Sequence, residues 1–168
     1  MELNHKLLRQ FEQEAANTRK MLERVPQEHF DWKPHAKSMT LKRLAGHVAE
    51  LPGMFIARVL QTEEHDFQKT QYTPFDGTTH QELMQLFEDS YQKAVKALND
   101  TNVVEIAKTW TLRHGEHVIL SAPRQVFIRT LAMNHIIHHR GQLSVYLRLL
   151  DVPVPGMYGP TADENFPL

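Results

Sequence analysis

The stretch NHIIHHRGQLSVYLRLL, residues 134–150, decides the fold, because it follows a helical period and its buried face carries two histidines. His135 and His139 are four residues apart, so on a helix they lie one turn above each other, roughly 40° apart around the axis. Leu131 and Leu149 fall close to the same direction, which places both imidazoles in the buried stripe. Two unpaired imidazoles in one core are costly, so the spacing favours a shared metal ion over two core histidines satisfied by hydrogen bonds.

His47 is the third candidate ligand, from the helical pattern TLKRLAGHVAEL over residues 40–51. Leu44, Leu51, Met54 and Arg58 lie within roughly 60° of it on a helical wheel, so the His47 side chain also faces inward. We therefore predict that His47, His135 and His139 bind one divalent ion. Three protein ligands leave coordination positions open, which is typical of a catalytic metal site. Zinc or nickel is the expected ion, with iron, manganese and copper as further candidates for an imidazole site.

Pro52 interrupts the same helical pattern shortly after His47. Proline lacks a backbone N–H and its ring clashes with the preceding turn, so a kink or the end of the helix is expected there. Either outcome makes the backbone irregular about one turn from the proposed metal. We therefore expect room for a pocket next to the site.

Composition indicates a small globular protein with a single domain, residues 1–168, because this length supports one sizeable core. The net charge is −1, with 19 basic and 20 acidic residues, which gives no electrostatic footprint for nucleic acid or anionic membrane. The segment MELNHKLLRQFEQEAAN lacks the hydrophobic region of a signal peptide, and no apolar run approaches the roughly 20 residues of a membrane span. The absence of cysteine excludes thiolate zinc sites. We therefore expect a cytoplasmic protein.

Four long helical patterns run along the chain, at about residues 4–24, 40–60, 79–98 and 121–150. Thr40 is a good N-cap for the second pattern, and Thr79 with Glu82 fits a capping box at the start of the third. Pro123 marks the start of the fourth. The fold class predicted is all-α, a four-helix bundle, in which metal sites form in the core from side chains on facing helices.

Two other segments break the helical period. Residues 108–113 and 116–120 flank His114-Gly115, which indicates a short β-hairpin between helices three and four. The tail, residues 151–168, is rich in Pro and Gly and cannot continue a helix. Its apolar residues are expected to pack across the bundle or against a neighbouring subunit; they are Val154, Met157, Tyr158 and Phe166.

The segments SMTLKRLAGHVAEL, NHIIHHRGQLSVYLRLL and VPVPGMYGPTADE together resemble the DinB/YfiT-like superfamily of metal-binding bundles. The resemblance spans nearly the whole chain and maps the family's metal ligands onto His47, His135 and His139. It implies an up-down-down-up four-helix bundle, commonly a homodimer, that holds a divalent ion such as zinc or nickel. Characterised relatives include thiol-dependent S-transferases and a mycothiol-dependent maleylpyruvate isomerase, but most members have no assigned reaction.

Five polar residues near the proposed ligands have alternative interpretations. His138 falls on the flank of its helix and is expected at the surface or behind the ligands. Gln142 and Tyr146 share the His135 face, where they could orient a substrate, although support of a ligand and ordinary packing are the simpler uses. Glu50 could act as an acid, a base or a fourth ligand, but a solvated helix face is its expected environment. Arg140 could hold an anionic substrate, but a surface salt bridge is its expected use.

Two classes of function follow. The first is a metal-dependent enzyme of unknown substrate, either a transferase of low-molecular-weight thiols or a hydrolase. A bound ion lowers the pKa of a thiol or a water and so generates a nucleophile at neutral pH. The second is a non-catalytic metal-binding module, associated with stress or with dimerisation. The second class is favoured if protein fills the fourth coordination position, or if no cavity reaches the ion.

Overall fold

The computed structural model describes residues 2–164, so Phe166 of the apolar tail lies outside the described residues. The helices are α1 (Leu3–Leu22), η1 (Gln27–His29), α2 (Leu41–Leu51), η2 (Pro52–Ala57), α3 (Arg58–Gln61), α4 (His80–Asn99), α5 (Val103–Ala107), α6 (Arg124–Phe127), η3 (Ile128–Asn134) and α7 (His135–Leu149). The strands are β1 (Glu64–Asp66), β2 (Thr109–His114) and β3 (His117–Pro123). The protein is mostly helical, with a small three-stranded sheet.

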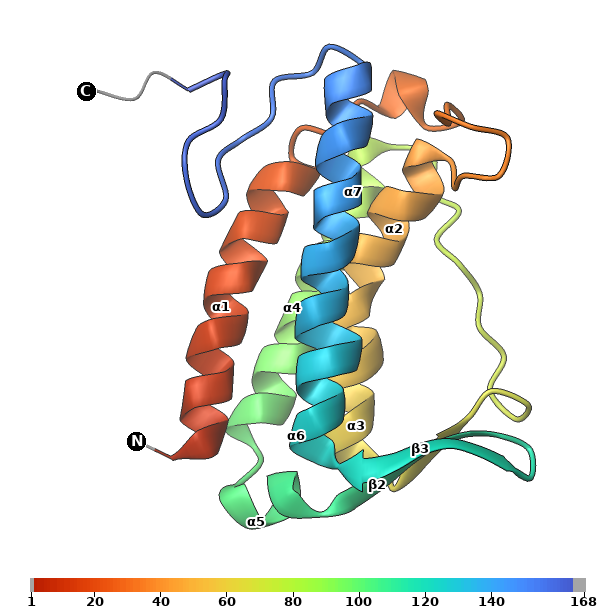
Figure 1. Ribbon diagram of the computed structural model, residues 1–168, viewed down its shortest axis with the longest axis vertical. Helices are drawn as coiled ribbons and strands as arrows, with labels where there is room; N and C mark the ends of the chain where they lie inside the picture. The colour runs from red at the N-terminus through yellow and green to blue at the C-terminus, as the bar shows by residue number, and fades with distance from the viewer. Residues whose placement is uncertain (1, 165–168) are drawn as a thin grey trace.

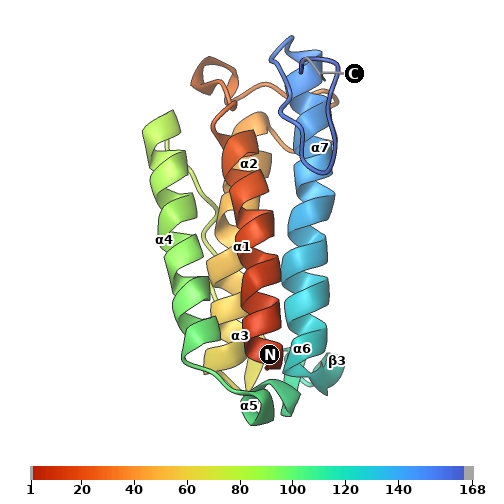
Figure 2. The same ribbon diagram turned by 90° about the vertical axis from the view of Figure 1, so that its left-hand side faces the viewer.

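Four long helical segments run side by side in Figures 1 and 2: α1, the run α2–η2–α3, α4, and the run α6–η3–α7. The first and the last lead away from the end of the molecule that carries the sheet, whereas the other two run toward it. Buried apolar side chains from all four segments form one continuous core. The predicted helix ranges agree with these segments to within a few residues, because each range carries the helical period of apolar side chains.

The helix starts predicted from capping residues are confirmed. The Thr40 side chain accepts a hydrogen bond from the Arg43 backbone N–H at 3.2 Å. Thr79 and Glu82 form the complete capping box, in which the Glu82 carboxylate also accepts from the Thr79 backbone N–H at 2.9 Å. These contacts satisfy backbone donors that the first helical turn leaves free.

The β-hairpin predicted between the third and fourth helices is present, but it belongs to a sheet with a third strand. β2 pairs antiparallel with β3, and β1, from the connection after α3, pairs parallel with β2. Only three residues form β1, too few for a readable alternation of apolar and polar side chains. Asp66 ties β1 to the hairpin turn, because its carboxylate accepts hydrogen bonds from the backbone N–H groups of Gly115 and Gln68, both at 2.9 Å.

The irregularity predicted at Pro52 takes the form of the π-helical segment η2, and the helix continues through it to Gln61. Ser90 of α4 hydrogen-bonds two backbone groups at this irregular turn. Its hydroxyl accepts from the Gly53 N–H at 2.7 Å and donates to the Glu50 carbonyl at 3.0 Å. The approach of the two helices requires glycine at position 53, because a Cβ there would lie 2.9 Å from the Ser90 hydroxyl and 3.1 Å from its Cα.

A second π-helical segment, η3, precedes His135 in the last long helix, and it contacts η2. No proline or glycine marks residues 128–134, so the sequence did not predict it. Both long helices that carry the candidate ligands therefore contain a widened turn at the same level of the molecule. Such π-helical turns are frequent at functional sites.

The tail folds back beside α1 and α7 (Figure 1). Val154 is buried, the Met157 carbonyl accepts a hydrogen bond from the Asn17 amide at 3.1 Å, and Met157 packs against the core. Packing of the tail across the helices is thus observed for Val154 and Met157, whereas Tyr158 remains 64% exposed. None of the helices within residues 2–164 has the length and apolar character needed to cross a membrane.

Arg140 corrects one expectation: its salt bridge is buried, with the side chain 2% exposed. Its guanidinium donates to the Glu14 carboxylate at 2.7 Å, to the Glu14 carbonyl at 2.9 Å and to the Thr18 hydroxyl at 3.1 Å. The Tyr158 hydroxyl from the tail joins both charged groups. The expectation of a surface ion pair was wrong because the tail, which has no regular period, covers this face of α7.

Candidate metal centre

The three predicted ligands meet in the core between α2 and α7. His47 comes from α2, and His135 and His139 come from adjacent turns of α7. One nitrogen from each ring can be chosen so that the three lie within 4.8 Å of one another. Ring centroids are 5.2 Å apart for His47–His135, 4.8 Å for His47–His139 and 4.6 Å for His135–His139. The fold therefore brings together the side chains that the helical spacing singled out.

The two histidines of α7 point their Nε2 atoms at each other. Their Nε2 atoms are 2.8 Å apart. His139 Nδ1 lies 2.7 Å from the Gln142 amide oxygen, which can only accept, so the ring proton of His139 is on Nδ1. Because His139 Nε2 carries no proton, it either accepts from His135 Nε2–H or shares a cation with His135 Nε2. A divalent ion bound beside both atoms would take the place of that proton.

Both rings are neutral at pH 7. Burial lowers the pKa of His139 to about 4, despite the opposing effect of the hydrogen bond to Gln142. Burial, and then the proximity of His47, lower the pKa of His135 as well. Neutral imidazole is the form that binds a metal ion.

His47 contributes a further unsatisfied atom. Its Nδ1 is buried and makes no hydrogen bond within residues 2–164. The Glu50 carboxylate oxygen is 4.0 Å away, which is longer than a hydrogen bond. A buried nitrogen without a partner costs free energy. Three clustered imidazoles, two with their Nε2 atoms 2.8 Å apart and one with an orphaned nitrogen, thus fit the requirements of a divalent ion.

Glu50 corrects a second expectation, because its side chain is only 10% exposed and does not lie on a solvated face. The Tyr72 hydroxyl donates to its carboxylate at 2.5 Å, and the Phe75 N–H donates at 2.7 Å. Burial alone would raise the pKa of this carboxyl, but the hydrogen bonds from Tyr72 and the Phe75 N–H hold it below the usual value. The connection between α3 and α4 covers Glu50, and it approaches α2 so closely that a Cβ at Gly46 would lie 2.7 Å from Phe75.

A cavity of about 220 Å³ adjoins the cluster through His47. The residues that line it are His47, Met54, Phe55, Arg58, His65, Phe67, Thr70, Gln71 and Tyr72. Among the described residues, no carboxylate joins the three imidazoles as a potential ligand. The arrangement therefore offers three ligands on one side and a cavity at the edge of the site.

Three neighbouring polar residues, His138, Gln142 and Tyr146, have the simpler of the roles predicted for them. His138 is exposed. Gln142 fixes the tautomer of His139, as expected of a residue that supports a ligand. The Tyr146 hydroxyl donates to the Met39 carbonyl at 3.1 Å, and its ring packs edge-on against Trp32, so it anchors a loop.

Sequence reasoning missed the residues that close the site from outside the helices. Tyr72 and His65 belong to the connection between α3 and α4, which has neither helical nor strand periodicity beyond β1. Arg58 is the first residue of α3, just beyond η2, and the helical wheel places it on the His47 face, so its direction was predictable although its role at a cavity was not. The unusual length of the connection was the one available signal that it had a role.

Comparison with protein families matches residues 1–165 to the DinB family. The uncharacterized protein YrdA of Bacillus subtilis is 30% identical over 166 residues, which cover 96% of this chain and 91% of YrdA. The uncharacterized protein YjoA of the same organism is 27% identical over 133 residues, 78% of this chain and 80% of YjoA. The crystal structure of YjoA, a DinB-like protein, superimposes with a TM-score of 0.68 at 23% identity, covering 88% of this chain and 96% of that one. A DinB-like protein from Bacillus cereus gives a TM-score of 0.70 at 23% identity, covering 90% and 95%.

Proposed function

The chain belongs to the DinB family, and on that premise we propose that it is a metal-dependent enzyme that transfers a low-molecular-weight thiol or hydrolyses a small substrate. His47, His135 and His139 hold one divalent ion, zinc or nickel, inside an up-down-down-up four-helix bundle. The observation that carries the proposal is the convergence of three imidazoles, one nitrogen of each within 4.8 Å of the others, with the buried His47 Nδ1 left without a hydrogen-bond partner among residues 2–164. A divalent ion bound there would take one nitrogen from each ring.

The protein's own residues prepare the site. Gln142 holds the His139 ring with Nε2 toward the cluster, and the ionised Glu50 places a negative charge next to His47. Tyr72 and the Phe75 N–H in turn fix the Glu50 carboxylate. When bound, the ion supplies Lewis acidity, which lowers the pKa of a thiol or a water at the site. Outer partners of this kind orient metal ligands and raise their basicity.

The cavity at His47 favours an enzyme over a non-catalytic metal-binding module. A module needs only a closed site, whereas here no carboxylate within residues 2–164 completes the ligand set and a cavity of about 220 Å³ reaches His47. Catalytic metal sites keep such a position for water or substrate. The non-catalytic alternative becomes the better account if the loaded protein turns over no substrate.

Turnover tests the proposal directly. The zinc- and nickel-loaded proteins are incubated with glutathione and chlorodinitrobenzene, and separately with nitrophenyl acetate, and product is followed by absorbance. We expect turnover by the wild type in one of the two assays and its loss in the His135→Ala protein. The His138→Ala protein is the matched control and should retain the activity, because this side chain is exposed. Loaded protein that turns over neither substrate pair would favour the module.

We also propose that the protein forms a homodimer. Large apolar side chains are exposed on β3 and α7: Val118, Ile119, Leu120, Val145 and Leu149. β3 is an edge strand, and edge strands and apolar patches are commonly covered in an assembly. Light scattering at micromolar concentration should report twice the chain mass of 19.5 kDa. A species with the mass of one chain would contradict the dimer.

A further inference from the structure

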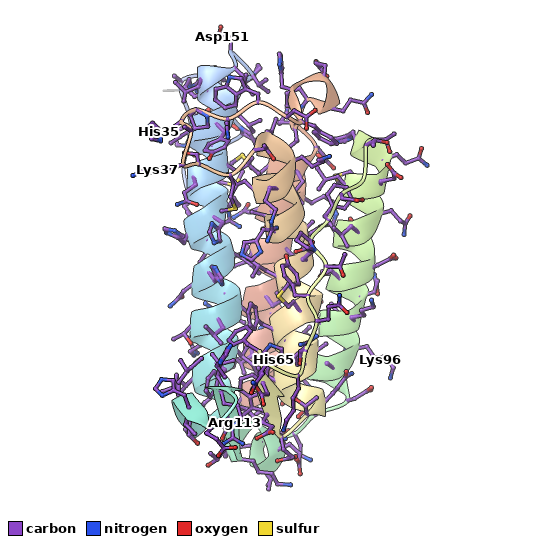
Figure 3. All side chains as sticks on the ribbon, turned by 90° about the vertical axis from the view of Figure 1, so that its right-hand side faces the viewer. His35, Lys37, His65, Lys96, Arg113 and Asp151 are labelled. Atoms are coloured by element: carbon purple, nitrogen blue, oxygen red, sulfur yellow. The ribbon has the colours of Figure 1, made fainter. Side chains whose placement is uncertain are left out.

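The cavity next to His47 has a charged group on its wall. Arg58 follows His47 on the same helical run, about three turns further along. It lines the cavity together with His65, which Figure 3 labels on the side of the molecule that the connection between α3 and α4 crosses. The cavity thus extends from the histidine cluster to a guanidinium.

The charge of Arg58 has no carboxylate partner within residues 2–164. Its side chain contacts His65 Nδ1 at 2.7 Å, and because a guanidinium can only donate, this nitrogen accepts and the imidazole is neutral. Burial, and then the charge of Arg58, lower the pKa of His65, which keeps the ring in this form. By contrast, Arg124 and Arg140, both buried, pair with carboxylates. Arg58 therefore retains a full positive charge and free donors.

The remaining walls of the cavity are largely apolar. Met54 and Phe55 come from η2, and Phe67 lies beyond β1 with its ring edge-on to His65. The volume of about 220 Å³ is below the roughly 300–1,000 Å³ of pockets for drug-sized ligands. A matching ligand is small, has an apolar body and carries one negative charge.

We propose that this cavity binds a small organic acid, the substrate of the metal centre, whose carboxylate pairs with Arg58. The apolar body of the acid lies against Met54, Phe55 and Phe67, and its reacting group faces His47. The planar guanidinium matches a carboxylate, which two parallel hydrogen bonds can hold. A dianionic phosphate would leave one charge without a partner. The role as substrate rests on the proposed function, whereas binding of the carboxylate to Arg58 does not require the metal.

Binding of a matched pair of probes tests the proposal. Hydrocinnamate and its neutral amide, hydrocinnamamide, are titrated into the full-length protein, both metal-loaded and metal-free, and binding is followed by calorimetry. We expect the acid to bind at least about tenfold more tightly than the amide in both forms of the protein. In the Arg58→Gln protein the acid should lose about ten- to a hundredfold in affinity and the preference should disappear. The Arg58→Lys protein, which keeps the cation, should retain part of the preference.

Arg24→Gln is the matched control, because it removes one exposed arginine outside the cavity. It should leave both affinities unchanged. Equal binding of acid and amide by the wild type would overturn the proposal. A preference for the acid that persists in the Arg58→Gln protein, or that exists only in metal-loaded protein, would place the carboxylate on the ion and would also overturn it.

Arg58→Gln also removes the contact with His65, which helps to hold β1, so a second variant is needed that tests the cavity without removing this contact. Met54→Trp fills the apolar end of the cavity and leaves the Arg58–His65 contact intact. It should abolish binding of hydrocinnamate, and retained binding would contradict the proposal. Metal content separates the proposed metal-dependent function from the proposed binding of a carboxylate to Arg58. If the protein binds the acid through Arg58 but binds no metal, only the proposed function is refuted.

Discussion

His139 and Arg140 are neighbours on α7, yet they enter two buried polar clusters that differ in how completely their hydrogen bonds are made. On the α1 side, Arg140 is surrounded by Glu14, Thr18 and Tyr158, and every buried side-chain atom of these groups has a partner. On the α2 side, the histidine cluster has two Nε2 atoms 2.8 Å apart and an orphaned nitrogen, His47 Nδ1. A fully satisfied cluster stabilises the fold, whereas an unsatisfied one in the same core indicates a ligand.

The largest expected effect comes from breaking the satisfied cluster. Glu14→Ala leaves the buried Arg140 guanidinium without its carboxylate, which should lower the free energy of unfolding by about 3–5 kcal/mol. Urea unfolding followed by circular dichroism measures it. Glu12→Ala, at an exposed position of the same helix, is the control and should change stability by less than about 0.5 kcal/mol. A loss in the Glu14→Ala protein as small as in the control would mean that the ion pair does not hold α1 to α7.

A smaller effect is expected from weakening the support of the unsatisfied cluster. Glu50→Gln removes the negative charge next to His47 and should weaken zinc binding about ten- to a hundredfold, the usual consequence of losing an outer partner of a metal ligand. Competition with a zinc-binding dye measures the affinity. Glu116→Gln in the exposed hairpin turn removes the same charge and should have no effect. If both variants bind zinc as the wild type does, Glu50 does not position His47.

The smallest effect is a pH dependence in the stability of the metal-free protein. The pKa of His139 is about 4 and that of His135 is also lowered, whereas an unfolded histidine titrates near 6.5. Below about pH 6.5 the unfolded state binds more protons than the folded state, so stability falls as the pH drops toward 4. The fall in melting temperature should be smaller in the His139→Ala protein. Parallel pH profiles for the two proteins would contradict the burial of neutral imidazoles.

The contrast between the clusters also explains how much could be predicted from the sequence. His47, His135 and His139 were predictable because each lies on a regular helix, where spacing along the chain fixes direction in space. Arg140 lies on the same helix, but its partner Tyr158 lies in a tail without periodicity, so the sequence could not reveal that the ion pair is buried. Spacing along a regular helix predicts the direction of a side chain, but it does not predict which irregular segment will cover that side chain.

The same limit applies on the α2 side. The sequence predicted an irregular backbone at Pro52 and a pocket next to it, and η2 and the cavity bear this out. The helical wheel also places Arg58 on the His47 face, but Tyr72 and His65, which complete the cavity, lie in the connection beyond α3, where no period relates position to direction. The second widened turn, η3, could not be predicted from the sequence, because no proline or glycine marks it. In the structure it packs against η2.

Metal content is the most direct test of the central claim that the unsatisfied cluster is a metal site. Wild-type, His139→Ala and His138→Ala proteins are purified from medium supplemented with zinc and nickel, and their metal is measured by mass spectrometry. We expect about one ion per chain in the wild type and in the His138→Ala protein, and strong loss in the His139→Ala protein. Equal metal content in the wild type and the His139→Ala protein would contradict the claim.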